Sequence, residues 1–451
     1  MRRLALISAA GAAALMIGAG AAGATLASEH AGPQGDGTSI TPVGWRVTPA
    51  GSQTPLGGTL PTASALSPDG RLLLVLNAGD GTYESVQVID TATQHVTQTI
   101  PYQSPQGVYA GVAFSPGGKS AYSSGGSSEK IHVYSVSGGQ LTEGSPIQLP
   151  TTNPAGQSVN MYPAGLAVTP DGKRLVVADE MADAASVVDL ATGRVSTVGV
   201  GHNPYGVAIS PGGRTAYVSD QGADTVSVLD ISGATPSLTG TIEVGTHPNR
   251  MVVDPRSGTL YVANSESDSV SVIPAAASRP ARTISLSPYR GAPIGSNPDG
   301  LALSADGGTL YAANSGDNDV DVIDVRAGQV LGMIPTAWYP TSVVASLDDR
   351  TLFVTNGKAL GAGPNPNGPN PYTDNQLSGT AAWQAQYVGT MMKGSLSSIA
   401  TPDPAERARY TQQVVRNDEF GQTDQVRAAR QGNPVPARVG GRPRSSTSST
   451  S

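Results

Sequence analysis

The feature that most constrains the fold of this chain is a ten-residue interval that recurs seven times along its 451 residues. In each repeat a turn residue, often within a Ser-Pro-Asp-Gly-like tetrapeptide, is followed ten positions later by a small or polar residue that ends an apolar run. The pairs are Ser67 and Asn77, Ser115 and Gly125, Thr169 and Asp179, Ser210 and Asp220, Asp254 and Asn264, Ser304 and Asn314, and Ser346 and Asn356. Because the interval stays constant while the repeat lengths vary, we infer one repeated supersecondary unit whose variation lies in loops.

A proline stands six residues before the turn in six of the seven repeats, and the second repeat has Pro105 instead, displaced by a four-residue insertion. These six prolines are Pro61, Pro163, Pro204, Pro248, Pro298 and Pro340.

Each repeat predicts four short antiparallel strands. In the fourth repeat they cover Gly206 to Ser210, Thr215 to Asp220, Thr225 to Asp230 and Leu238 to Val244. Valine alternates there with serine, threonine or aspartate, which is the period of two expected when one face of a strand is buried. Seven such units predict an all-β fold, a seven-bladed β-propeller.

The seventh repeat lacks a fourth strand, while an unpaired strand-like segment, Val43 to Thr48, lies around Trp45 before the first repeat. We therefore expect this N-terminal strand to close the ring by completing the last blade, which gives a propeller over residues 43–401. A Pro-, Gly- and Asn-rich insertion, residues 357–393, interrupts the last blade, and we interpret it as a docking surface.

The segments outside the propeller have distinct compositions. Residues 1–27 predict a secretory signal peptide, with an uncleaved membrane anchor as the alternative, and residues 28–42 predict a flexible leader. Residues 402–418 predict a helix, because Asp403 is a suitable N-cap, Pro404 follows it and Glu406 stands three residues after it. Residues 419–451 predict a disordered tail, with polyanion binding by its five arginines as the alternative.

Composition excludes several classes of function. There are no cysteines, so disulfides, thiol catalysis and thiolate metal sites are excluded. The formal net charge is −7, and loss of Arg2 and Arg3 with the signal would make it −9, which does not suit a nucleic-acid partner. We expect an exported monomer in the periplasm, outside the cell or at its surface, with no membrane span after signal cleavage.

The second-strand sequences YVAN (Tyr261 to Asn264), YAAN, YVSD and FVTN, with their SPDG-like turns, resemble the YVTN-type seven-bladed propellers, which include YncE-like bacterial proteins. From Trp338 onward, the chain contains the stretches WYPTSV, VTNGKALGAGPNPNGPNP, YVGTMMKGSLSSI and PDPAERARYTQQVVRND. In these stretches the chain resembles exported proteins in which such a propeller precedes a phosphoesterase domain of the alkaline-phosphatase superfamily. This resemblance implies a phosphoesterase domain as partner. The likeness stops near Gly440, so no catalytic residue, metal ligand or cofactor of that domain is transferred to this chain.

The residues themselves offer one candidate site, at the mouth of the central channel. The five histidines are too scattered along the sequence to form a metal cluster. The segment with Asp317, Asp319 and Asp321 resembles a calcium loop but lacks its glycine, so we expect Asp319 and Asp321 to form a solvated strand edge. The residues before the blade prolines should ring the mouth, joined by one inward arginine, and together they could hold an anionic small molecule or bind only water. These candidates are Tyr162, Asn203, His247, Arg250, Asn297 and Tyr339, and in the docking insertion Lys358, Asn365, Tyr372, Tyr387 and Lys393.

The sequence therefore favours an exported, non-catalytic propeller that binds a small molecule or an envelope component, or docks a phosphoesterase domain. A lactonase-like hydrolytic propeller that uses the channel mouth is one alternative, and a cell-surface adhesion module is another.

Overall fold

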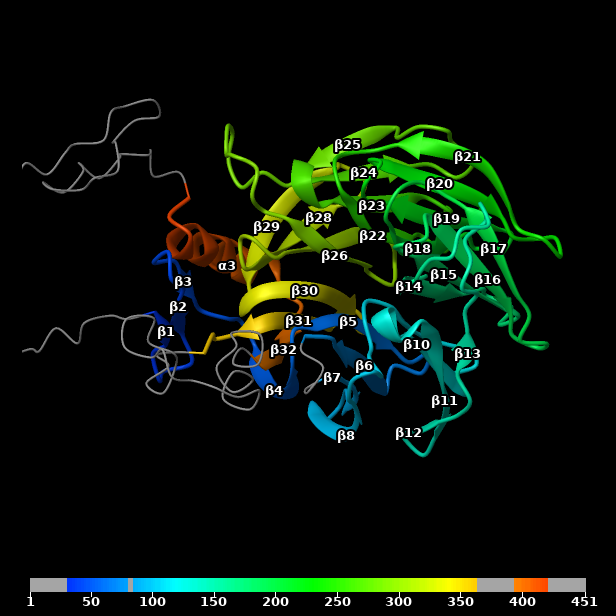
Figure 1. Cartoon of the computed structure of the whole chain (residues 1–451). Coiled ribbons are helices and arrows are strands. Elements are labelled where there is room, and N and C mark those ends of the chain that lie inside the picture. Colours follow the sequence, from blue (N-terminus) through cyan, green and yellow to red (C-terminus); the bar gives the residue numbers. More distant parts are fainter. Residues whose placement is uncertain (1–30, 80–83, 363–392, 421–451) are drawn as a thin grey trace, which may run out of the picture.

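The computed structural model describes residues 31–79, 84–362 and 393–420. Its described strands form eight small antiparallel sheets, and seven of these follow one another around a ring (Figure 1). The first strand of each blade contacts the first strands of its neighbours, and the seventh contacts the first. The predicted all-β, seven-bladed propeller is confirmed.

Blades one to three use these strands. Blade one has β5 (Pro61–Leu66), β6 (Leu72–Asn77), β7 (Glu84–Asp90) and β8 (His95–Tyr102); blade two has β9 (Val112–Phe114), β10 (Ser120–Ser124), β11 (Lys130–Ser137), β12 (Gln140–Glu143) and β13 (Ile147–Gln148); blade three has β14 (Pro163–Val168), β15 (Arg174–Asp179), β16 (Ala184–Asp189) and β17 (Val195–Gly199). In blade two, both β12 and β13 pair with β11.

Blades four to six are regular. Blade four has β18 (Pro204–Ile209), β19 (Thr215–Asp220), β20 (Thr225–Asp230) and β21 (Ser237–Glu243); blade five has β22 (Pro248–Val253), β23 (Leu260–Asn264), β24 (Ser269–Ile273) and β25 (Arg282–Ser285); blade six has β26 (Pro298–Leu303), β27 (Thr309–Asn314), β28 (Asp319–Asp324) and β29 (Gln329–Pro335). Short 3₁₀ turns, η1 (Gly126–Ser128) and η2 (Ser265–Ser267), follow the second strands of blades two and five.

An N-terminal strand does close the ring, but the predicted residues were wrong. The last blade has the order β30 (Trp338–Ala345), β31 (Thr351–Ala359), β32 (Lys393–Ala400) and β4 (Ser52–Thr59). Trp45 lies outside it, because Arg46–Val47 (β3) pairs with β2 (Ser39–Ile40), which also pairs with β1 (Gly32–Pro33) in a separate small sheet. Part of the expected flexible leader is therefore paired strand. The sequence signal failed because β4, SQTPLGGT, contains a proline and two glycines.

The core is divided among the seven contacts between neighbouring blades. Each contact holds its own cluster of buried apolar side chains, including the one that closes the ring, where Leu56 of β4 packs with Leu73, Val75 and Phe353. Alternate residues of each strand thus pack on opposite neighbours.

The ten-residue interval connects the turn between the first two strands with a buried polar residue at the end of the second strand. At its start, the Ser67 hydroxyl accepts a hydrogen bond from the backbone N–H of Leu72 at 2.9 Å and fixes the turn. At its end, Asn77 pairs with Pro61 across the first two strands, and its buried amide donates to Ser85 and Gln87 of the third. The equivalent contacts recur in other blades, so the proline and the polar residue mark the same level of the blade.

The predicted C-terminal helix is confirmed as α3 (Pro404–Asn417). The Asp403 carboxylate accepts hydrogen bonds from the backbone N–H groups of Ala405 and Glu406, both at 2.8 Å, as an N-cap should. The helix lies along β29 of blade six, with the small β1–β3 sheet beside it (Figure 1). The predicted signal peptide, and the predicted tail beyond residue 420, lie outside the described residues.

Candidate functional site at the channel mouth

The residues before the blade prolines occupy equivalent positions, and the backbone conformation there is left-handed. Their φ angles are 50° at Tyr162, 49° at Asn203, 55° at His247, 50° at Asn297 and 68° at Tyr339. In each case the backbone N–H donates to an Asp or Asn side chain; for example, His247 donates to the Asp224 carboxylate of the preceding blade at 2.9 Å. At Tyr162 the acceptor is Asn160 of the same loop, whereas at the other four positions it lies in the preceding blade, so those four backbone N–H groups link blades.

The position directly after the proline carries polar groups that sequence reasoning missed. In blades four, five and six it holds Tyr205, Asn249 and Asp299. The Asn249 amide donates to the Asp299 carboxylate at 2.8 Å and to the Ser265 hydroxyl at 3.3 Å. Asn249 is only 8% exposed, and its Oδ1 has no hydrogen-bond partner. Since a buried acceptor without a donor is costly, this oxygen is an atom that a ligand or water can satisfy.

Arg250 reaches across the channel. Its Nη2 donates to the backbone carbonyl of Thr62 in blade one at 2.6 Å and to that of Ala110 in blade two at 3.1 Å. Its guanidinium carbon also lies 6.0 Å from the centre of the Tyr205 ring. The expected inward arginine is thus inside the channel, where it braces blade five against two other blades.

Two carboxyl groups near the mouth are held by burial toward their neutral form. Burial raises the pKa of Asp299 to about 6, although Ser315, Arg250 and His247 act in the opposite direction. Burial likewise raises the pKa of Glu180, opposed by Tyr109 and His247, and the buried Glu180 Oε2 has no hydrogen-bond partner. Groups whose pKa approaches neutrality can exchange protons with a ligand.

Tyrosine rings accompany these acids. The Tyr109 ring lies edge-on to Tyr162 at 5.0 Å between centroids and to Tyr205 at 6.3 Å. The Glu180 carboxylate raises the pKa of Tyr162, after the larger effect of burial, and Asp299 does so at Tyr339. The structure therefore brings together four of the predicted site residues, Tyr162, His247, Arg250 and Tyr339. They lie with four residues that were not predicted, Tyr109, Glu180, Tyr205 and Asp299. Nothing in the described contacts draws the side chains of Asn203 and Asn297 into this group.

A cavity of about 170 Å³ lies in the channel itself. First-strand residues of all seven blades line it, and Arg250 is its one charged lining residue within the described chain. Glycines keep the strands close there: a Cβ on Gly206 would lie 2.4 Å from the Asn249 carbonyl oxygen. The space suits a few waters, and it falls below the roughly 300 Å³ of ordinary small-molecule sites, so a larger ligand would have to bind at the mouth.

The docking insertion is described only at its ends. Gly357–Ala359 continue β31, and Lys393 begins β32. The Lys358 ammonium lies 4.2 Å from the ring centre of Tyr339 and 5.0 Å from that of Trp338, so it is placed beside the mouth. Burial lowers the pKa of Lys358. Asn365, Tyr372 and Tyr387 lie outside the described residues.

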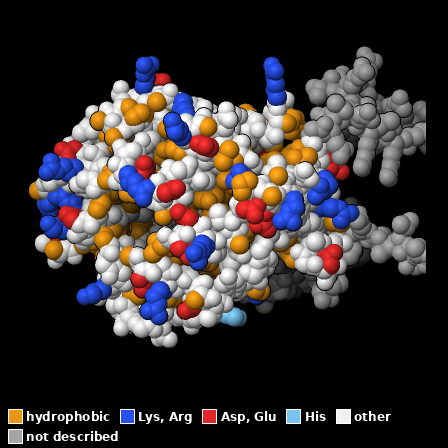
Figure 2. All heavy atoms as spheres, turned by 180° about the vertical axis from the view of Figure 1, so that it is seen from behind, with side chains coloured by type: hydrophobic (Ala, Val, Ile, Leu, Met, Phe, Trp, Pro, Cys, Tyr) orange, Lys and Arg blue, Asp and Glu red, His pale blue; other side chains and the backbone are white. Residues whose placement is uncertain are grey.

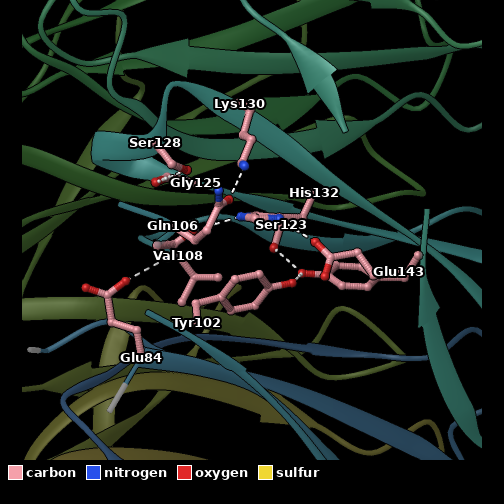
Figure 3. A network of polar contacts seen from close by, with 12 residues as sticks. Glu84, Tyr102, Gln106, Val108, Ser123, Gly125, Ser128, Lys130, His132 and Glu143 are labelled. Carbon is pink, nitrogen blue, oxygen red and sulfur yellow. Dashed lines mark hydrogen bonds and ion pairs between the residues drawn. The ribbon is translucent and has the colours of Figure 1, made fainter. Parts of the chain in front are cut away.

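A second polar network joins blades one and two (Figure 3). The buried His132 ring lies 2.7 Å from the Glu143 carboxylate through Nδ1 and 2.8 Å from the Gly107 carbonyl through Nε2. Beside it, the Tyr134 hydroxyl contacts those of Tyr102 at 2.6 Å and Ser123 at 2.9 Å. Since a carbonyl only accepts, Nε2 carries a proton, and the network fastens the inserted loop of blade two to its strands.

Other site classes receive no support from the described residues. No group of three His, Asp or Glu side chains there could hold a metal ion, and no helix there is long and apolar enough to cross a membrane. On the face drawn in Figure 2, Lys and Arg side chains are interspersed with acidic ones, so that face has no continuous basic surface.

Comparisons with known proteins agree with the propeller class. The family model described as "Lactonase, 7-bladed beta-propeller" matches residues 61–203 and 201–280, just under half of the chain. This chain is similar to that family over those residues. No curated protein matches it.

One solved structure shows a similar fold. Hydrazine synthase of Kuenenia stuttgartiensis is 21% identical, with a TM-score of 0.56, and the match covers 67% of this chain and 94% of that one. A functionally unknown protein from Desulfotomaculum acetoxidans is 17% identical, with a TM-score of 0.47, over 62% of this chain and 86% of that one. At 21% identity, the likeness to hydrazine synthase concerns the fold alone.

Proposed function

We propose that this chain is an exported binding module whose channel mouth holds a small, uncharged molecule rich in hydroxyl groups. The observation that carries the proposal is the pair formed by Asn249 and Asp299: a buried amide oxygen without a donor stands beside a carboxyl group whose pKa burial raises to about 6. Glu180 adds another buried acceptor without a donor. Hydroxyl groups of a ligand would supply the missing donors.

The surroundings favour a neutral ligand over the anion expected from the sequence. Arg250 already donates to two backbone carbonyls, and the Asp299 carboxyl group stands near it. Tyrosine faces such as those of Tyr109 and Tyr205 can cover the apolar faces of a polyol while the acids bind its hydroxyls.

This proposal can be tested by isothermal titration calorimetry. D-glucose and myo-inositol serve as hydroxyl-rich probes, and acetate and phosphate serve as anionic probes. The polyols should bind and the anions should not, and Asn249→Leu should weaken polyol binding at least tenfold. Glu266→Gln, which changes an exposed acid near His247, is the matched control. Binding of phosphate or acetate in preference to both polyols would contradict the proposal.

Lactone hydrolysis is the second candidate, and it is favoured by the similarity to the lactonase propellers and by Asp299 beside Arg250. An ionised Asp299 could act as general base toward water, and the acyl oxygen could accept from a guanidinium N–H of Arg250. Purified protein should then hydrolyse D-glucono-1,5-lactone above the spontaneous rate, and Asp299→Asn should remove that activity. Turnover that survives this replacement would count against a role for the mouth.

The resemblance of the C-terminal part to phosphoesterase-associated propellers supports a further role for the module, as the docking partner of such a domain. Adhesion to envelope polymers remains the alternative for a module that binds without turnover. Fractionation of the producing cells, with N-terminal sequencing of the mature chain, would test the export on which these roles depend.

A further inference from the structure

The C-terminal end of α3 is buried among carboxyl groups from blade six. Asp418, the C-cap of α3, is 6% exposed, and Asp317 and Asp319 are 7% and 1% exposed. Asp321, on the same strand as Asp319, is 2% exposed. The sequence-based expectation of a solvated edge at Asp319 and Asp321 was wrong, because β28 is an inner strand that pairs with β27 on one side and with β29 on the other.

These four carboxyl groups lack neutralising partners. None of them forms an ion pair within the described residues. The Asn314 amide donates to Asp319 at 2.8 Å and to Asp321 at 3.0 Å, whereas Asp319 Oδ2 and Asp418 Oδ1 are buried without a hydrogen-bond partner. Buried ionised carboxylates without counter-charge are very unfavourable, so this packing requires protons on most of the cluster.

The other charged groups around the cluster do not change this conclusion. Asp268 of blade five faces Asp317, and its carboxylate accepts from the backbone N–H groups of Gly295 and Asn297. Arg416 on α3 and Glu419 just after the helix are exposed, and Arg290 is exposed in the loop that contacts Phe420 through Tyr289.

The same helix also holds the N-terminal segment. Gln413 donates to the Thr48 carbonyl at 2.9 Å, and Asn417 donates to the Thr48 hydroxyl at 2.8 Å. Near the middle of α3, the Thr411 hydroxyl accepts from the backbone N–H of Met333 in β29 at 2.9 Å. Thr48 lies four residues before β4, the strand that closes the ring.

We propose that α3 is a proton-controlled latch, docked on blade six while the Asp317–Asp319–Asp321–Asp418 cluster is protonated and released when the cluster ionises. This inference goes beyond the proposed ligand binding and does not depend on it. Release would free Thr48 from α3 and loosen the segment that leads into the closing strand.

The direction of the pH dependence follows from burial. Burial raises the pKa of Asp418 to about 8, that of Asp321 to about 7 and that of Asp317 to about 6, and it raises the pKa of Asp319 well above its usual range. The docked state therefore binds more protons than the released state, and docking weakens as pH rises from about 4 to 8. Each proton lost on release changes the docking equilibrium by up to about tenfold per pH unit.

The latch can be tested by hydrogen exchange, measured by mass spectrometry on the peptide that covers residues 404–420. The exchange rates are corrected for the intrinsic effect of pH. In the wild type, protection should fall at least tenfold per pH unit between pH 6 and 8. Asp418→Asn should make this fall less steep by up to about tenfold per pH unit, because it removes one of the released protons, and Asp319→Asn should do so independently. Glu419→Gln, at the exposed neighbouring acid, should behave as the wild type.

Two results would overturn the latch. One is a pH dependence in Asp418→Asn and Asp319→Asn as steep as in the wild type. The other is restoration of wild-type protection at pH 8 by millimolar Ca²⁺, because the cluster would then be a cation site and protons would not be its natural partner.

Discussion

Asp179 allows a direct test of how much a buried carboxyl group inside a blade affects the stability of the protein. It ends β15 at the level where blades one, five, six and seven carry Asn77, Asn264, Asn314 and Asn356. Asp179 is 0% exposed, its Oδ2 accepts from the Ser186 hydroxyl at 2.7 Å, and its Oδ1 has no partner. Burial raises its pKa from 3.8 to about 8.

The raised pKa makes Asp179 destabilising at neutral pH. The folded protein keeps the proton that the unfolded chain loses above pH 4, so the free energy of unfolding falls as pH rises toward 8. At about 1.4 kcal/mol per pKa unit, the loss reaches about 4 kcal/mol at pH 7, an upper limit because structural relaxation reduces it. Asp179→Asn removes this loss and allows the amide to donate to Ser186, as Asn264 donates to Ser271 at 3.1 Å.

Equilibrium urea unfolding at pH 5 and pH 7.5 measures the effect. Asp179→Asn should raise the free energy of unfolding by about 2–4 kcal/mol at pH 7.5 and by less at pH 5. Asp220→Asn is the matched comparison, because Asp220 accepts from Thr225, Ser227 and the Gly201 N–H and should gain less. Asp179→Asn that destabilises the protein equally at both pH values would refute the reasoning.

Three further substitutions test the ring, the channel and the helix. Leu56→Ala, in the cluster that closes the ring, should cost about 2–5 kcal/mol in urea unfolding, and a cost below 1 kcal/mol would indicate that β4 contributes little to closure. Gly206→Ala places a Cβ 2.4 Å from the Asn249 carbonyl oxygen, so it should lower the melting temperature, whereas Gly212→Ala, where nothing lies within 4 Å, should not. Asp403→Ala removes two hydrogen bonds at the start of α3 and should cost about 1 kcal/mol of helix docking by hydrogen exchange; unchanged exchange would mean that the cap is dispensable.

Much of the fold was predictable because its determinants are local. A turn serine, a period-two strand and a polar residue at the end of the interval fix each blade within about forty residues, and seven copies fix the ring. The helix was predictable for the same reason, since Asp403, Pro404 and Glu406 lie within one turn. The prolines predicted a candidate site at the positions before and two after them, and Tyr205, Asn249 and Asp299 were missed because the position directly after each proline was not considered.

The sequence alone determined the number of blades, the polar level within each blade and the helix, because each depends on residues near one another in the chain. Only the tertiary structure decided which N-terminal strand closes the ring and what the inward arginine contacts. Arg250 donates to carbonyl groups 188 and 140 residues away, and Asp317 raises the pKa of Asp418, which follows it by 101 residues. Such contacts arise when ring closure brings distant segments together, and no periodicity in the sequence encodes them.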